Sequence, residues 1–206
     1  MKHFAHMDVT SFKEAANATA AGSAVAIAGG TDLLGTLKDE ILRTYPATVV
    51  NLKTIPDGAY ITEDGDTVRI GALTKLRDVA ESDLVKQKFT CLAEAAAKAA
   101  SPTIRSMGTI GGNICQQHRC WYFRCADNRF DCIRKGGSYC PAMVGDNRYH
   151  SIFGDQDGCY AVSSQETAPA LIALGATVKT TSRDIPAAEF FKANGPRSNV
   201  LEDGEI

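Results

Sequence analysis

The sequence lacks the features that assign a chain to several common classes. It contains no run of about 18 apolar residues, so no segment is expected to span a membrane. Its start, MKHFAHMDVTSFKEAA, contains no apolar signal-peptide core, and we expect the cytoplasm as its compartment. The 22 basic and 24 acidic side chains nearly cancel, so the charge gives no reason to expect nucleic acid or an anionic membrane as a partner.

Motifs of common enzyme classes are missing as well. The chain contains no HExxH, no recognisable Ser-His-Asp set and no pair of catalytic carboxylates, so we predict no catalytic side chain. It contains neither GxGxxG nor a Walker lysine. No internal repeat or low-complexity segment occurs, and 206 residues with 44% apolar content suffice for one large or two small domains.

The hydrophobic pattern predicts an α+β protein with two lobes. Residues 9–21 have the pattern of a short amphipathic helix, and residues 24–28 and 48–52 that of buried strands. Between these strands, LLGTLKDEI predicts a helix that Thr31 or Asp32 would cap. This β-loop-α-β unit has the size of a crossover unit. We expect it to form a small N-terminal lobe, residues 1–54, followed by a larger lobe, residues 55–206.

The larger lobe is predicted to mix helices with short strands. YITEDGDTVRIGAL predicts a hairpin that turns at Asp64 and Gly65. FTCLAEAAAKAA predicts an alanine-rich helix that ends before Pro102 and contains Cys91, which we expect in the core. Further helices are expected in TKLRDVAES, capped by Thr74, and in ETAPALIAL. MGTI, YAVSS and ATVKTTS are expected to be strands.

Two glycine-rich turns are the first candidate binding elements. AGGTDLL, residues 28–34, joins a predicted strand to a helix start, and TIGGN, residues 109–113, is the second turn. Glycines let backbone N–H groups approach a ligand closely, and a helix start adds free donors that suit a phosphate. Either turn alone is explained as well by a tight turn or a bulge. Together, two such turns in separate lobes predict a clamp around one pyrophosphate.

Cysteines are the second candidate binding elements, because six of the seven gather in one segment. The spacing is Cys115-x4-Cys120-x4-Cys125-x6-Cys132-x7-Cys140-x18-Cys159. No CxxC occurs, which excludes a zinc ribbon and a simple bacterial ferredoxin pattern. An odd number of cysteines in a cytoplasmic chain disfavours a disulfide framework. Thiolate-rich sites select zinc, copper(I) or iron–sulfur, and the spacing leaves zinc and an iron–sulfur cluster equally open. Buried structural cysteines and redox-reactive thiols are the lesser alternatives.

The same segment carries several basic side chains and two histidines. Cations there would offset the negative charge of thiolates around a metal, and histidines could tune such a site. The simpler expectation is that all of them are ordinary solvated loop residues. They are Arg119, Arg124, Arg129, Arg134, Lys135, His118 and His150.

AGGTDLL, TIGGN and TAPALIALGA, in this order and spacing, resemble the FAD-binding medium subunit of the molybdenum hydroxylase family. That family includes xanthine dehydrogenases, aldehyde oxidoreductases, carbon monoxide dehydrogenases and 4-hydroxybenzoyl-CoA reductase. The resemblance implies a two-lobed FAD-binding fold with FAD between the lobes. It also implies that Glu166, before the APAL helix, contacts FAD, although relatives commonly have Asp there. The residues implied to hold the FAD pyrophosphate are Ala28, Gly29, Gly30, Thr31, Asp32, Leu33, Leu34, Thr109, Gly111, Gly112 and Asn113.

The cysteine insertion, at about 114–160, resembles only a subset of that family. Proteins similar to 4-hydroxybenzoyl-CoA reductase and certain bacterial aldehyde oxidoreductases carry an extra [4Fe-4S] cluster there. Their pattern is Arg-Cys soon after GGN, then Cys-x7-Cys, then Cys before a Tyr-Ala strand. By this resemblance the ligands are Cys120, Cys132, Cys140 and Cys159. Cys125, or less readily Cys115, remains a rival of Cys120.

The resemblance implies an oxidoreductase subunit that transfers electrons through FAD and iron–sulfur clusters. Its partners would be a large molybdopterin-binding subunit and a small [2Fe-2S] subunit in a heterotrimer, with ferredoxin or NAD as external electron partner. The family's C-terminal domain is expected to be absent, because the chain stops at VLEDGEI. Two alternatives remain: a non-catalytic, zinc-stabilised binding module, and an FAD-free scaffold subunit. Substrate and electron direction do not follow from this chain.

Overall fold

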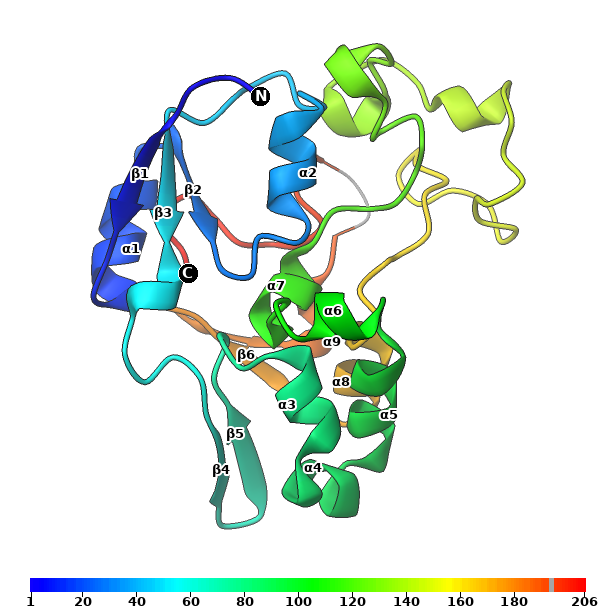
Figure 1. Cartoon of the computed structure of the whole chain (residues 1–206). Helices are drawn as coiled ribbons and strands as arrows, with labels where there is room; N and C mark the ends of the chain where they lie inside the picture. Colours follow the sequence, from blue (N-terminus) through cyan, green and yellow to red (C-terminus); the bar gives the residue numbers. More distant parts are fainter. Residues whose placement is uncertain (193–194) are drawn as a thin grey trace.

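The N-terminal part of the chain folds around a three-stranded parallel sheet (Figure 1). The computed structural model describes residues 1–192 and 195–206. The sheet has the order β1-β3-β2, with β1 (Ala5–Asp8), β2 (Ala24–Ile27) and β3 (Thr48–Asn51). Both outer strands pair parallel to the central β3, which confirms the predicted crossover unit. Strand β1 was not predicted, because all four of its residues are exposed and give no alternating pattern.

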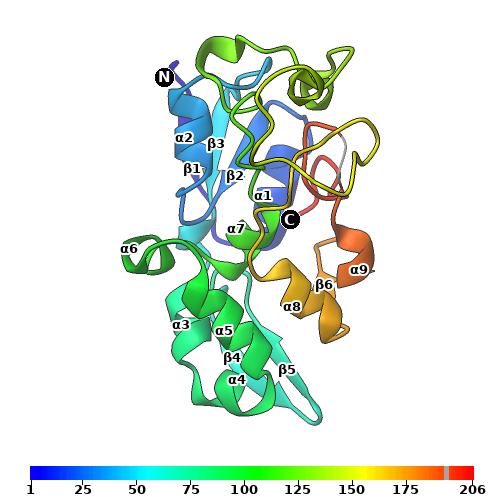
Figure 2. The same cartoon turned by 90° about the vertical axis from the view of Figure 1, so that its right-hand side faces the viewer.

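Two helices cover opposite faces of this sheet, as Figures 1 and 2 show. Helix α1 (Phe12–Thr19) covers one face and packs against Val50, whereas α2 (Leu33–Lys38) covers the other and packs against Val49. Adjacent strand residues point to opposite faces, so these two valines supply one core each. Ser11 caps α1 by accepting a hydrogen bond from the Glu14 amide at 3.1 Å.

The remainder of the chain is mainly helical around a second core. The predicted hairpin is confirmed, with Asp64 paired to Thr67 across a two-residue turn. Helices α3, α4, α5, α7 and α8 contribute side chains to one apolar cluster. The elements are β4 (Ile61–Asp64), β5 (Thr67–Ile70), α3 (Leu76–Glu81), α4 (Asp83–Lys88), α5 (Thr90–Lys98), α6 (Pro102–Arg105), α7 (Ile110–Cys115), α8 (Ala168–Ala173), β6 (Thr177–Lys179), β7 (Asp184–Pro186) and α9 (Ala187–Phe190). The expected mixed α and β fold class is thus confirmed.

Several local predictions for this part were wrong. The side chain of Thr74 exchanges hydrogen bonds with the backbone of Tyr60 instead of capping α3, whose N-cap is Lys75. Helix α5 ends at Lys98, and Pro102 begins α6, where its missing N–H costs no hydrogen bond. MGTI and YAVSS form no strand. Cys91 is exposed on α5 and does not belong to the core.

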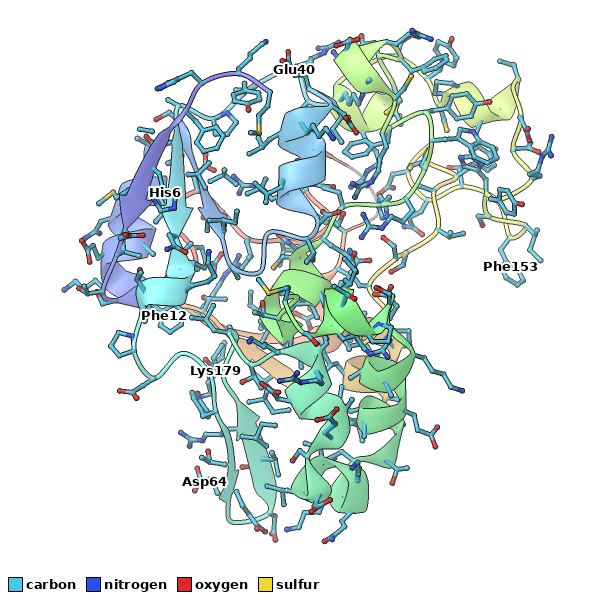
Figure 3. All side chains as sticks on the ribbon, in the orientation of Figure 1. His6, Phe12, Glu40, Asp64, Phe153 and Lys179 are labelled. Carbon is cyan, nitrogen blue, oxygen red and sulfur yellow. The ribbon has the colours of Figure 1, made fainter. Side chains whose placement is uncertain are left out.

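The cysteine segment, residues 116–165, is a long excursion between α7 and α8 (Figure 1). Its regular structure consists of short 3-10 turns at Ala126–Asn128, Ile133–Lys135 and Pro141–Met143. Figures 1 and 3 show it beside α2, with Phe153 at its outer tip. Among the helices of the described ranges, none has the length and apolarity needed to cross a membrane.

Candidate cofactor sites

The two glycine turns lie against each other. A Cβ atom on Gly29 would stand 2.1 Å from the Met107 carbonyl oxygen and 3.0 Å from the Cα of Gly108. A Cβ atom on Gly108 would in turn lie 3.5 Å from Oγ1 of Thr31. The backbone of the first turn and that of residues 107–108 approach so closely that a side chain at position 29 would clash, which explains why this residue is glycine. The first glycine turn thus lies against the two residues that immediately precede TIGGN.

The second turn begins helix α7 and is neither a bulge nor a hairpin. Thr109 is the N-cap, and its Oγ1 accepts a hydrogen bond from the Gly112 amide at 3.1 Å. A Cβ atom on Gly111 would meet the Ala72 carbonyl oxygen at 2.8 Å, so this glycine lets α7 pack closely. A Cβ atom on Gly112 would meet only Thr109 Oγ1 within 4 Å, at 3.1 Å. Gly112 thus leaves the exposed side of the turn open to a ligand.

Asn113 and Glu166 are joined directly. Asn113 is buried, and its Nδ2 donates to Glu166 Oε2 at 2.7 Å. The amide of Gln116 also donates to this oxygen, at 2.9 Å. On the other side, Asn113 Oδ1 accepts from Oγ1 of Thr167 at 2.7 Å. The structure therefore brings Glu166 to the second glycine turn, and the Glu166 residue is exposed there.

Asp32, in the first glycine turn, bonds to the cysteine segment. It occupies the N-cap position of α2, but its side chain makes no cap hydrogen bond. Its carboxylate instead accepts from the Gln117 amide at 2.9 Å, Arg119 Nη1 at 2.5 Å and Arg124 Nη2 at 2.6 Å. Two guanidinium groups are stronger partners for a carboxylate than backbone amides of its own helix, so the predicted cap is replaced.

Some of the other residues of the first turn stabilise the fold, and others are exposed to solvent. Gly30 has φ +72°, a left-handed conformation that favours glycine. The carbonyl of Ala28 accepts from Lys53 Nζ at 3.2 Å. Leu33 packs into the core beneath α2, whereas Thr31 and Leu34 are exposed beside the turn. The exposed residues are the ones available to a cofactor.

Four cysteines from separate parts of the excursion line one small cavity. They are the four that the family resemblance selects, Cys120, Cys132, Cys140 and Cys159. The last three are nearly fully buried. Sequence spacing alone could not identify this set, because each sulfur reaches the cavity from a different irregular turn.

The two rival cysteines, Cys115 and Cys125, lie outside this cavity lining. Cys115, at the end of α7, packs with Ile114 and Phe190, and burial raises the pKa of its thiol to about 12. Cys125 is half-buried in front of the Ala126–Asn128 turn. In this arrangement Cys120, rather than either rival, completes the set of four.

The sulfurs surround the cavity without meeting at one point. Within residues 1–192 and 195–206, no three His, Cys, Asp or Glu side chains are close enough to bind a single metal ion. Burial raises the pKa of the Cys120 and Cys159 thiols, and neighbouring thiols raise it further. Four cysteines around one cavity form a donor set that suits a thiol-seeking group.

Two buried cations accompany these thiols. Arg134 is 1% and Lys135 is 7% exposed, so the expectation that both are solvated was wrong. Both lie over the Phe123 ring, at 5.9 and 5.5 Å from its centroid. Burial lowers the pKa of both groups, and the thiol of Cys159 beside Arg134 opposes this shift. Among the described residues, Lys135 Nζ has no hydrogen-bond partner, and a buried positive charge is costly without compensation, so the surroundings of the cavity suit an anionic occupant.

Both histidines of the segment are buried, also against expectation. Nε2 of His150 lies 3.2 Å from the Cys120 sulfur, and its ring packs edge-on against Trp121. Burial, followed by the charge of Arg134, lowers the pKa of His118 to about 4. His118 is therefore neutral at pH 7 and adds no third cation beside the cavity.

A family model described as the FAD binding domain in molybdopterin dehydrogenase matches residues 2–206 of this chain. The aldehyde oxidoreductase FAD-binding subunit PaoB of Escherichia coli (strain K12) is 32% identical over 216 residues, covering 100% of this chain and 67% of that protein. The carbon monoxide dehydrogenase medium chain of Hydrogenophaga pseudoflava is 39% identical over 92 residues, covering 45% of this chain and 31% of that protein.

The fold is also similar to solved structures. Carbon monoxide dehydrogenase from Hydrogenophaga pseudoflava, in the form that lacks the Mo-pyranopterin moiety of the molybdenum cofactor, has a TM-score of 0.69 and 25% identity. The match covers 100% of this chain and 57% of that chain. The chain thus spans between about half and two thirds of the length of these full-coverage relatives.

Proposed function

Because the chain belongs to the family of FAD-binding domains of molybdopterin dehydrogenases, we propose that it carries FAD and passes electrons within a larger oxidoreductase. The contact between Gly29 and the backbone of residues 107–108 carries this proposal, since it joins the two glycine turns into one cradle. We propose residues 1–54 and 55–206 as the two lobes, with FAD between them. Bound FAD would exchange single electrons with iron–sulfur clusters and electron pairs with an acceptor such as NAD.

The residues proposed to hold the FAD pyrophosphate are those of the two turns, Ala28 to Leu34 and Thr109 to Asn113. Gly112 offers an open backbone surface in the second turn, and Thr31 and Leu34 are exposed in the first turn. Glu166 is proposed to contact the cofactor from the start of α8. Its carboxylate is already oriented by the amides of Asn113 and Gln116, which supports a fixed position for that contact.

We further propose a [4Fe-4S] cluster held by Cys120, Cys132, Cys140 and Cys159, as in the cysteine-containing subset of the family. The four thiols around one cavity, next to the buried Arg134 and Lys135, support an anionic thiolate-bound group. The alignment with the aldehyde oxidoreductase subunit covers the whole chain, and so includes the cysteine segment. A zinc-stabilised module without flavin is not favoured, because the family match covers the glycine turns and no single-ion site is found in the described ranges.

The proposed partners are a large molybdopterin-binding subunit and a small [2Fe-2S] subunit in a heterotrimer. Relatives named as medium chains of carbon monoxide and glyceraldehyde dehydrogenases support a multi-subunit assembly. Ferredoxin or NAD is proposed as the external electron partner.

The proposal is tested on anaerobically purified protein by a visible spectrum, with flavin, iron, zinc and acid-labile sulfide measured on the same sample. We expect one flavin and about four iron and four sulfide per chain, the content of one cysteine-ligated cluster. One zinc without flavin would support the binding module instead. Flavin without iron would retain the family function and overturn the cluster.

Matched cysteine variants separate ligands from other thiols. Cys132→Ser is expected to lose the iron and sulfide, because Cys132 lines the cavity and is buried. Cys91→Ser, on the exposed surface of α5, is expected to retain both. Equal iron content in the two variants would contradict the proposed ligand set.

A further inference from the structure

Helix α2, which follows the first glycine turn, is attached at both ends to the cysteine segment. At its start, Asp32 accepts hydrogen bonds from Gln117, Arg119 and Arg124. Beyond its end, the carbonyl of Asp39 accepts from the Asp127 amide at 2.9 Å. Figure 1 shows α2 alongside the excursion, and Figure 3 places Glu40, just beyond the helix, next to it.

The attachment beyond the end of α2 continues into the cysteine cavity. Ile41 is 1% exposed and packs in one cluster with Phe123 and Cys132. Arg43 forms an ion pair with Asp131, the residue before Cys132. The residues that follow α2 thus pack against side chains that line the cavity.

The cysteine segment has little structure of its own. Between α7 and α8 it contains short 3-10 turns and an isolated bridge, and most of its backbone hydrogen bonds join residues that are close in sequence. Four thiols bound to one group would cross-link its separate turns and reduce their freedom, as metal ligation does in small irregular domains. Cys120 belongs to residues 117–124, so such a cross-link would restrict these residues directly.

From these contacts we infer that Asp32 couples the two cofactor sites: a filled cysteine cavity holds the first glycine turn in the position that binds FAD. This inference rests on the proposed function. Asp32 acts as a positioning residue, because its carboxylate is used by three donors of the cysteine segment. The coupling is reciprocal by thermodynamic linkage, so bound FAD also retains the cluster.

The test compares FAD affinity with and without the cluster, using flavin fluorescence quenching on the same preparation before and after oxidative iron removal with EDTA. In the native sequence we expect cluster removal to weaken FAD binding about tenfold, the effect of one hydrogen bond to a charged group. In Asp32→Asn the same removal should change the affinity less than twofold. FAD should slow iron loss to the chelator in the native protein and leave it unchanged in Asp32→Asn.

Two further variants make the outcome decisive. Arg119→Gln removes one donor from a side chain that is 52% exposed, so it is expected to fold and to reduce the coupling partially. Asp64→Asn removes a carboxylate that is also paired with an arginine, Arg69, in the distant hairpin (Figure 3), and should retain the full coupling. Native protein that holds both cofactors but binds FAD equally with and without iron overturns the coupling alone. Protein without flavin overturns the proposed function and the coupling with it, whereas protein with flavin but without iron retains the FAD function and overturns both the cluster and the coupling.

Discussion

Arg124 donates a hydrogen bond from Nη2 to Oδ1 of Asp32 at 2.6 Å, across 92 positions of sequence. The two side chains are 20% and 17% exposed, so the pair is largely shielded from water. Burial lowers the pKa of Arg124, and the Asp32 carboxylate acts against this shift. Together with the bonds from Gln117 and Arg119, this ion pair joins the first glycine turn to the cysteine segment.

Replacing Arg124 by glutamine is expected to destabilise the fold by about 2 kcal/mol. The change removes one of the positive charges that compensate the shielded Asp32 carboxylate. It also removes the hydrogen bonds from Arg124 to the carbonyls of Gln117 and His118. The free energy of unfolding from urea titration measures this effect. The control is Arg148→Gln, whose partner Asp146 lies on the surface and whose loss should leave the free energy of unfolding almost unchanged. Equal losses would contradict a special role for the Arg124 pair.

Gly29→Ala is expected to separate the two glycine turns. Its Cβ would lie 2.1 Å from the Met107 carbonyl oxygen, a backbone atom that cannot turn aside. We expect a loss of at least about 2 kcal/mol of stability together with loss of FAD binding, measured by urea titration and flavin content. Gly35→Ala, in α2, has open space around its Cβ and should stabilise by about 0.5 kcal/mol. Normal flavin content in Gly29→Ala would refute the proposed cradle.

The cavity lining distinguishes Cys120 from Cys125 as the first cluster ligand. Cys120→Ser is expected to lose most of the iron, because its sulfur lines the cavity, whereas Cys125→Ser should keep the native content of about four iron per chain. Iron and sulfide assays, with circular dichroism to confirm folding, check the pair. The reverse result would assign the site to Cys125 and require a rearranged turn at residues 120–125.

Glu205 is expected to contribute to acid stability. It accepts from Arg183 Nε at 2.9 Å and from Thr180 Oγ1 at 2.7 Å, and the hydrogen bond from Arg183 is the main cause that holds its pKa at about 2. A free glutamate has a pKa of about 4.3, so the contribution is complete above that pH and is lost as the pH falls towards 2. Because Arg183 is half-exposed, we expect on the order of 2 kcal/mol.

Urea titrations between pH 7 and pH 2 test this directly. Glu205→Gln should be less stable than the native sequence at pH 7 and equally stable near pH 2. A stability difference that does not change with pH would attribute the effect of the substitution to packing.

The sequence by itself determined the regular parts of this molecule. Residues 24–28, AVAIA, form a continuous apolar run, which is typical of a buried parallel strand, and Gly65 follows from an alternating hairpin pattern. The three motifs in their order indicated the family, and the family pattern pointed to the four cysteines that line one cavity. Local periodicity and short motifs suffice for the strands, the hairpin and the glycine turns, because each of these is encoded within a few neighbouring residues.

Only the tertiary structure decided the roles that depend on distant partners. Asp32 has the sequence position of a helix cap, yet it binds two arginines about 90 positions away, because guanidinium groups outcompete its own backbone amides. Arg134 and Lys135 read as solvated loop residues, yet they are buried beside the thiols. The cysteine segment has almost no periodic structure, so its burial and its convergence on one cavity arise from long-range packing that no local pattern records.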